Sequence, residues 1–201
     1  MIVVNKLVEG SLDDALATKL IHSVGLIPGD SYGKKGYPYI ADKIKSFNRS
    51  AKGEFYLFTL VDFMDSRLNC PSEVIMKLLP HPSPNMVFRV VVRELESWLI
   101  ADRKNLAKFL KISLQQIPDN PESINDPKRT LVNLARKSSS LKIRSALVPE
   151  TGSTSQVGKL YSSEMVCFIQ KFWNIETATR NAPSLDRCLT RLGQFKKSTT
   201  K

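Results

Sequence analysis

Two nearly continuous apolar runs constrain the fold of this chain more than any other feature. Residues 55–61 and 86–92 are short, rich in β-branched and aromatic side chains, and preceded by Gly, Pro or Asn. Runs of this kind are typical of strands that are covered on both faces, as the strands of parallel sheets are. Residues 2–8 form a third run of the same type.

Helical spacing of apolar residues separates these strands. Helices are predicted over residues 11–25, 39–47 and 71–79, and a short strand at residues 26–27 is followed by a Gly-rich loop at residues 28–36. Alternating strands and helices predict an α/β fold with a mainly parallel four-stranded sheet and helices on both faces. The connections between the strands should be right-handed.

The second half of the chain differs in pattern and in charge. Helices are predicted near residues 96–111, 127–137, 156–172 and 183–194. We therefore expect an α/β core over residues 1–102, a basic helical C-terminal subdomain packed on it over residues 103–195, and a flexible tail over residues 196–201. Residues 1–100 hold 12 Lys and Arg against 11 Asp and Glu, whereas residues 101–201 hold 18 against 8.

The basic second half indicates a polyanionic partner, either nucleic acid or a nucleotide. The alternative is a solvated basic surface with no partner. The candidate nucleic-acid contacts are Lys34, Lys35, Lys128, Arg129, Arg136 and Lys137.

The composition also bears on the cellular compartment of the protein and on the kinds of site that the chain can form. No run approaches eighteen apolar residues, and the N-terminal residues lack the pattern of a signal peptide, so we expect a cytoplasmic protein with no membrane partner. Cys70, Cys167 and Cys188 are widely spaced, which argues against a disulfide framework and a zinc knuckle. The segment from Gly29 to Lys35 lacks the spacing of a Walker A loop.

Carboxylates follow three of the predicted strands. Glu9 follows the first strand, Asp62 and Asp65 follow the third, and Glu94 and Glu96 follow the fourth. In open α/β sheets the functional crevice lies outside the carboxyl ends of the strands. Carboxylates gathered there suit a hard cation, Mg²⁺ or Mn²⁺, which can assist phosphoryl displacement. The alternative is that these acids pair with Lys and Arg or cap helices.

The motif Leu-Val-Glu-Gly at residues 7–10 and the motif Leu-Val-Asp at residues 60–62 resemble the Toprim pattern. That fold occurs in topoisomerases, bacterial primases and overcoming-lysogenization-defect nucleases. The resemblance implies that Glu9 is the acid–base residue and that Asp62 is a metal ligand. The Toprim pattern has Asp-x-Asp after the third strand, whereas here Asp62 and Asp65 are three apart, so both can face one side only if the chain turns.

The chain more closely resembles an uncharacterised family of bacterial Toprim-related proteins, often encoded beside ATP-binding-cassette-type ATPases in mobile or defence gene clusters. The segment Arg-Glu-Leu-Glu-Ser-Trp-Leu-Ile-Ala-Asp at residues 93–102 is the most specific part of this resemblance. It implies a nuclease-like Toprim protein that processes nucleic-acid phosphodiesters with a metal, in defence against phages or mobile elements. The alternative is a non-catalytic Toprim-like module that binds nucleic acid or docks with a partner ATPase.

Overall fold

The computed structural model describes residues 2–199, and its contacts divide the chain into two compact units. The sheet unit comprises Met1–Val92 and Asp186–Lys201, and the helical unit comprises Arg93–Leu185. The boundary expected from the sequence lay at residue 102, with the C-terminal residues in the helical part. The chain instead returns to the sheet unit at Asp186, so most of the C-terminal helix belongs to that unit.

Contacts within the sheet unit explain this return. The ring of Phe195 packs edge-on against Tyr56 with 5.8 Å between the ring centroids. Lys196 Nζ donates a hydrogen bond of 2.9 Å to the carbonyl of Val24. The helix continues to Thr199, so residues 196–199, predicted to be a flexible tail, are helical. The rest of that tail, residues 200 and 201, lies outside the described residues.

The sheet unit contains a four-stranded parallel sheet in the order β2-β1-β3-β4. Its strands are β1 (Val3–Val8), β2 (Ile27–Gly33), β3 (Tyr56–Asp62) and β4 (Met86–Val91). The structure therefore confirms the predicted α/β class and parallel sheet. Its central strands are the apolar runs of the sequence, and Leu57, Phe58, Leu60 and Val61 are all fully buried.

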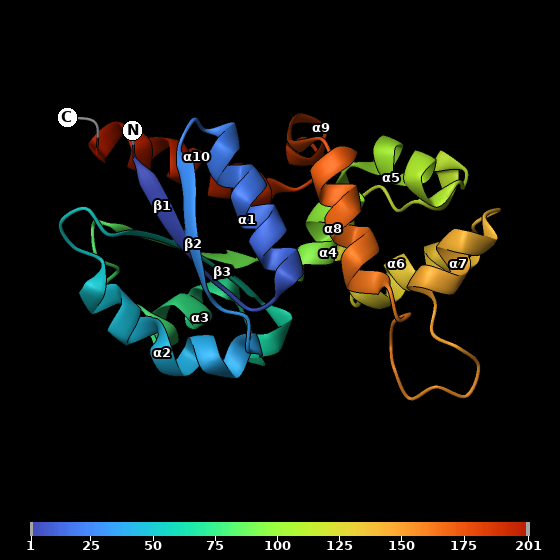
Figure 1. Ribbon diagram of the computed structural model, residues 1–201, viewed down its shortest axis with the longest axis horizontal. Helices are drawn as coiled ribbons and strands as arrows, with labels where there is room; N and C mark the ends of the chain where they lie inside the picture. The colour runs from blue at the N-terminus through green and yellow to red at the C-terminus, as the bar shows by residue number, and fades with distance from the viewer. Residues whose placement is uncertain (1, 200–201) are drawn as a thin grey trace. The chain divides into compact units, whose positions relative to one another are not determined.

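Helices cover both faces of this sheet, as Figure 1 shows for α1 (Ser11–Ser23), α2 (Gly36–Ser50), α3 (Pro71–Leu78) and the later part of α10 (Pro183–Thr199). The step from β1 to β2 runs one way across the sheet, and the next two steps run the other way. Right-handed connections then place α1 on one face and both α2 and α3 on the other. The face of α2 and α3 is filled by a cluster that includes Ile40, Ile44, Val74 and Phe88.

Strand β2 was only partly predicted, because most of it was assigned to a Gly-rich loop. It pairs with β1 alone, and an edge strand tolerates a residue such as Pro28. Gly29 is required by close approach, since a Cβ atom there would lie 2.5 Å from Asn5 Oδ1. Gly33 has a φ of +92°, and a Cβ atom there would lie 2.5 Å from the Val8 carbonyl oxygen.

The helical unit is built around two buried tryptophans. Trp173 Nε1 donates to the Trp98 carbonyl at 3.0 Å, and Trp98 Nε1 donates to Ser184 Oγ at 2.7 Å. Its helices are α4 (Leu95–Ala101), α5 (Arg103–Leu110), α6 (Pro127–Arg136), α7 (Leu141–Leu147), α8 (Tyr161–Lys171), α9 (Ile175–Thr179) and the first turn of α10. Helix α8 begins at Tyr161 rather than near residue 156, because the preceding Ser- and Gly-rich segment forms a loop.

Two further expectations concern composition. Over residues 2–199 no helix has the length and apolar character needed to cross a membrane. Cys70, Cys167 and Cys188 are free thiols. Burial raises the pKa of Cys188 to about 12, so this thiol is unreactive at neutral pH.

Candidate functional site at the carboxyl ends of two strands

Neighbouring parallel strands bring Glu9 and Asp62 together. Glu9 is the first residue after β1, and Asp62 is the last residue of β3, which pairs with β1. Glu9 Oε1 accepts a hydrogen bond from the backbone N–H of Asp62 at 3.2 Å. The side chain of Asp62 is 9% exposed. These two residues therefore meet at the sheet edge where the sequence predicted a site.

A turn then adds Asp65 to this pair. The 3₁₀ turn η1 (Met64–Ser66) follows β3, and Arg67 ends it in the left-handed conformation with a φ of 54°. This turn brings the Asp65 side chain close enough for its charge to act on the Glu9 carboxyl. The spacing of three residues required such a turn if Asp62 and Asp65 were to serve one site.

Asp13 completes the acidic cluster from the first turn of α1. Its Oδ2 atom accepts a hydrogen bond from the backbone N–H of Gly10 at 3.0 Å, which fixes the start of the helix beside Glu9. The sequence indicated Asp13 only as an acid near a helix N-terminus. Its position four residues after Glu9 was the available signal for its role in the cluster. We call Glu9, Asp13, Asp62 and Asp65 the strand-end cluster.

The environment keeps Glu9 protonated at neutral pH. Burial, followed by repulsion from Asp13 and Asp65, raises the pKa of Glu9 from 4.5 to about 8, against the opposing hydrogen bond from Asp62. A protonated Glu9 can donate its hydrogen to the Asp65 carboxylate.

The charges of Glu9 and Asp65 also act on the hydroxyl group of Tyr37. Burial raises the pKa of its hydroxyl above the usual range, and the charges of Glu9 and Asp65 raise it further. Tyr37 lies in the first turn of α2. The sequence did not indicate Tyr37, because nothing in the Gly-rich segment before it showed that this segment returns to β1.

Two lysines flank Glu9 through the connection between β2 and α2. The backbone N–H of Lys34 donates to the Val8 carbonyl at 2.8 Å, and that of Gly36 donates to the Glu9 carbonyl at 3.0 Å. The side chains of Lys34 and Lys35 are exposed. Lys35 Nζ lies 5.3 Å from the centroid of the Tyr39 ring, a cation–π distance.

Lys34 is held by an ion-pair network around Asp14. Asp14 lies 2.9 Å from both Lys34 Nζ and Lys6 Nζ, and Ser31 Oγ donates to it at 2.6 Å. Burial alone would raise the pKa of Asp14, but hydrogen bonds from Ser31, Lys34 and Lys6 lower it to about 2. The network ties the end of β2 to α1 and holds the Lys34 ammonium at Asp14.

Glu94 and Glu96 lie in the helical unit and have partners there. The backbone N–H of Lys128 donates to Glu94 Oε2 at 3.1 Å, and Lys128 Nζ lies 3.9 Å from Glu94 and 3.8 Å from Glu96. Tyr161 Oη donates to Glu96 Oε1 at 3.0 Å. Burial raises the pKa of Glu94, Lys128 lowers it and Glu96 raises it. Both acids therefore follow the alternative in which they pair with a basic residue.

The remaining basic candidates lie on α6 or directly after it. Arg129, Arg136 and Lys137 are exposed. The backbone N–H of Arg129 donates to the side chain of Asp126, the N-cap of α6, at 2.8 Å. Arg129 and Arg136 line one cavity, whereas Lys128 is occupied by the two glutamates.

The buried Asp102 was not identified from the sequence as an organising residue. Its carboxylate accepts hydrogen bonds from the Asn174 backbone N–H at 2.7 Å, the Thr177 hydroxyl at 2.8 Å and Asn105 Nδ2 at 2.8 Å. It joins α4, α5 and α9 within the helical unit. This role is structural, since the carboxylate is fully buried and satisfied.

The donor atoms of the strand-end cluster are carboxylate oxygens, which suit Mg²⁺ or Mn²⁺. Among residues 2–199, however, no three His, Cys, Asp or Glu side chains gather in an arrangement ready to hold a metal ion. Metal binding by Glu9, Asp62 and Asp65 therefore stays a prediction that rests on donor chemistry.

Comparisons of the chain with known protein families, with curated proteins and with solved structures found no match. The relation to Toprim proteins therefore stays a prediction from the sequence motifs.

Proposed function

We propose that this protein processes nucleic-acid phosphodiesters with the help of Mg²⁺ or Mn²⁺, and that the strand-end cluster is its active site. One observation carries the proposal: Glu9, at a strand end, accepts a hydrogen bond from the Asp62 N–H, and burial with the charges of Asp13 and Asp65 raises its pKa to about 8. Carboxyl groups with pKa values shifted toward neutrality occur frequently at catalytic sites.

Glu9 is the general acid and base of the proposed reaction. A carboxyl group whose pKa is close to the working pH can both give and accept a proton. In its protonated form Glu9 donates to the leaving oxygen of the phosphodiester. The ionised form that results accepts the hydrogen bond from the Asp62 N–H, which is already in place.

Asp62 and Asp65 are the residues that would hold the cation, and Glu9 would join them in its ionised form. A bound Mg²⁺ or Mn²⁺ supplies positive charge that offsets the charge on the phosphate oxygens. Lys34 and Lys35 lie after the neighbouring strand, where their ammonium groups can orient a phosphate. The Asp14 network restricts Lys34 to this position.

The four-stranded parallel sheet and the acid at the end of its first strand support a Toprim-like assignment. We further propose that the protein belongs to the Toprim-related family, that it acts with a partner ATPase, and that it takes part in defence against phages or mobile elements. These parts rest on the motifs at residues 7–10, 60–62 and 93–102.

A second candidate function is a non-catalytic module that binds nucleic acid or docks with an ATPase. The pairing of Glu94 and Glu96 with Lys128 favours it, because two of the five expected metal ligands are neutralised by a lysine. The exposed Arg129, Arg136 and Lys137 would then carry the binding of nucleic acid.

Cleavage assays separate the two functions. Plasmid DNA, single-stranded DNA and RNA are incubated with the full chain and either Mg²⁺ or Mn²⁺. We expect metal-dependent cleavage that Glu9→Gln and Asp62→Asn each reduce by about 100-fold or more. Glu54→Gln, which changes an exposed acid of the same unit, is the matched control and should cleave normally. A wild-type protein that cuts none of the three substrates with either metal supports the binding module instead.

A further inference from the structure

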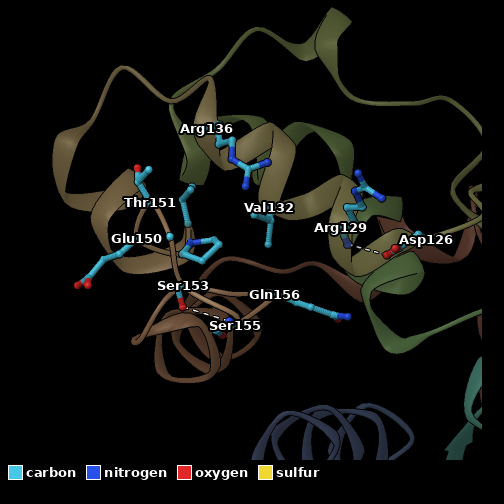
Figure 2. A pocket seen from close by; sticks show the side chains of 12 residues that line it. Asp126, Arg129, Val132, Arg136, Glu150, Thr151, Ser153, Ser155 and Gln156 are labelled. Carbon is cyan, nitrogen blue, oxygen red and sulfur yellow. Dashed lines mark hydrogen bonds between the residues drawn. The ribbon is translucent and has the colours of Figure 1, made fainter.

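A cavity of about 580 Å³ lies within the helical unit, between α6 and the loop of residues 148–156 (Figure 2). One wall is a single face of α6, which contributes Asp126, Arg129, Val132 and Arg136. Residues spaced by three or four share a helix face. The volume lies within the range of small-molecule sites, about 300–1,000 Å³.

The two acidic residues of this cavity are already engaged. Asp126 accepts the backbone N–H of Arg129 at 2.8 Å, as the N-cap of α6. Glu150 pairs with Lys159 Nζ at 2.8 Å, and Figure 2 shows its carboxylate directed away from α6. Lys159 therefore offsets the charge of Glu150, whereas Asp126 keeps its negative charge beside Arg129.

The two arginines, in contrast, have guanidinium groups left for a ligand. Among residues 2–199 the Arg129 side chain makes no hydrogen bond or ion pair. Arg136 uses Nη1 for Asn133 Oδ1 and keeps its other N–H groups. Guanidinium groups bind phosphate with two parallel hydrogen bonds, so this wall suits a phosphate ester.

The rest of the lining is apolar at its floor and polar at its rim. Val132 is only 2% exposed, so the apolar surface that a flat ring could contact comes from the partly buried Val148 and Pro149. Thr151 and Gln156 are exposed polar residues of the loop. A cavity with an apolar floor and a few polar groups is the usual form of a ligand site.

The loop opposite α6 is shaped by its own hydrogen bonds. The Ser155 N–H donates to Ser153 Oγ at 3.1 Å, and Ser155 Oγ donates to the Val157 carbonyl at 2.8 Å. Gly152 has a φ of +83°, which a residue with a side chain adopts only with strain. These features hold the loop as a wall of the cavity.

We infer that this cavity binds a nucleoside phosphate. Arg129 and Arg136 are seven residues apart, about 10 Å along the helix at 1.5 Å per residue. That separation matches a ligand with a phosphate at one end and a base at the other. The unpartnered Arg129 binds the phosphate, and the base lies on Val148 and Pro149 with the Arg136 guanidinium stacked against it.

The nucleoside phosphate can come from two sources, a free nucleotide or the 5′ end of a nucleic-acid strand. Both present the same phosphate, sugar and base. The site is defined by the helical unit alone, and the inference does not rest on the activity proposed for the strand-end cluster.

Isothermal titration calorimetry of the full chain tests the inference with AMP, adenosine and inorganic phosphate as probes. We expect AMP to bind more tightly than either fragment. Arg129→Ala should weaken AMP binding by about tenfold or more and leave adenosine binding unchanged, because it removes the charge-assisted hydrogen bonds to the phosphate. Arg136→Ala should weaken both AMP and adenosine. Arg129→Lys should restore part of the AMP affinity.

Lys142→Ala is the matched control, since it removes one positive charge from an exposed residue outside the cavity lining. Absence of AMP binding at millimolar concentration would overturn the inference. An equal loss of affinity in Lys142→Ala and Arg129→Ala would also overturn it, because the attraction would then be a general effect of net charge.

A single-stranded trinucleotide, with either a 5′-phosphate or a 5′-hydroxyl, identifies the source. Competition between AMP and the phosphorylated form alone supports the inference with a strand end as ligand. Binding of AMP without either trinucleotide supports it with a free nucleotide. Glu9→Gln should leave AMP affinity unchanged, so AMP binding by a protein that cleaves nothing contradicts only the proposed function.

Discussion

Replacing Glu9 by Gln should change how the stability of the protein depends on pH. The folded chain keeps the Glu9 proton up to a pH of about 8, whereas the unfolded chain loses it near 4.5. Between these values the folded state binds more protons, so the free energy of unfolding falls as the pH rises. A Gln at this position has the same shape, can accept the Asp62 N–H and cannot ionise.

The magnitude follows from the size of the pKa shift. One pKa unit corresponds to about 1.4 kcal/mol, so moving the pKa from 4.5 to about 8 sets an upper limit of about 5 kcal/mol. Water that enters around the ionised carboxylate screens its charge, so we expect about 2–3 kcal/mol in the folded protein. For a chain of this length that difference corresponds to about 4–12 °C in Tm.

The assay is urea denaturation of wild type and Glu9→Gln between pH 4.5 and pH 9, without divalent metal. The two proteins should have similar stability at the acidic end, and Glu9→Gln should be the more stable at pH 9. Glu54→Gln should follow wild type throughout, since that acid is exposed. Parallel curves for wild type and Glu9→Gln would refute the raised pKa of Glu9.

Three further perturbations follow from contacts in the two units. Asp14→Asn should lower the free energy of unfolding by about 2 kcal/mol in urea denaturation, because Lys6, which is 5% exposed, loses its charged partner. Since the pKa of Asp14 is lowered to about 2, its stabilisation is present above about pH 4, and wild type should lose it as the pH falls toward 2. Tyr161→Phe should cost about 1–2 kcal/mol in the same assay, because the buried Glu96 loses a hydrogen-bond donor. Mn²⁺ at pH 8 should raise the Tm of wild type by several degrees, measured by differential scanning fluorimetry, and should raise that of Glu9→Gln much less.

The parallel sheet could be predicted because β3 and β4 are nearly continuous apolar runs of strand length, which is typical of strands buried on both faces. Strand β2 could not be fully predicted, because Pro28, Gly29 and Gly33 are turn residues in most contexts. They are accepted here through pairing with β1 at the edge of the sheet. The return of α10 to the sheet unit was also missed, since an amphipathic helix does not show which surface it will cover.

The gathering of Glu9, Asp62 and Asp65 could be expected from the rule that parallel strands end at one edge. The participation of Asp13 and Tyr37 depends on how α1 and α2 begin, and the sequence does not specify that geometry. The pairing of Glu94 with Lys128 joins residues far apart in the chain through the packing of α4 on α6. No local sequence pattern indicates such a contact.

Direct titration of the Glu9 carboxyl by carbon-detected NMR, with and without Mg²⁺, tests the account of the strand-end cluster most directly. Without metal the carboxyl should titrate with a pKa of about 8. With Mg²⁺ the pKa should fall by more than one unit, because a cation held by the cluster favours the ionised form. A carboxyl that titrates near 4.5, or one whose pKa Mg²⁺ leaves unchanged, would contradict the account.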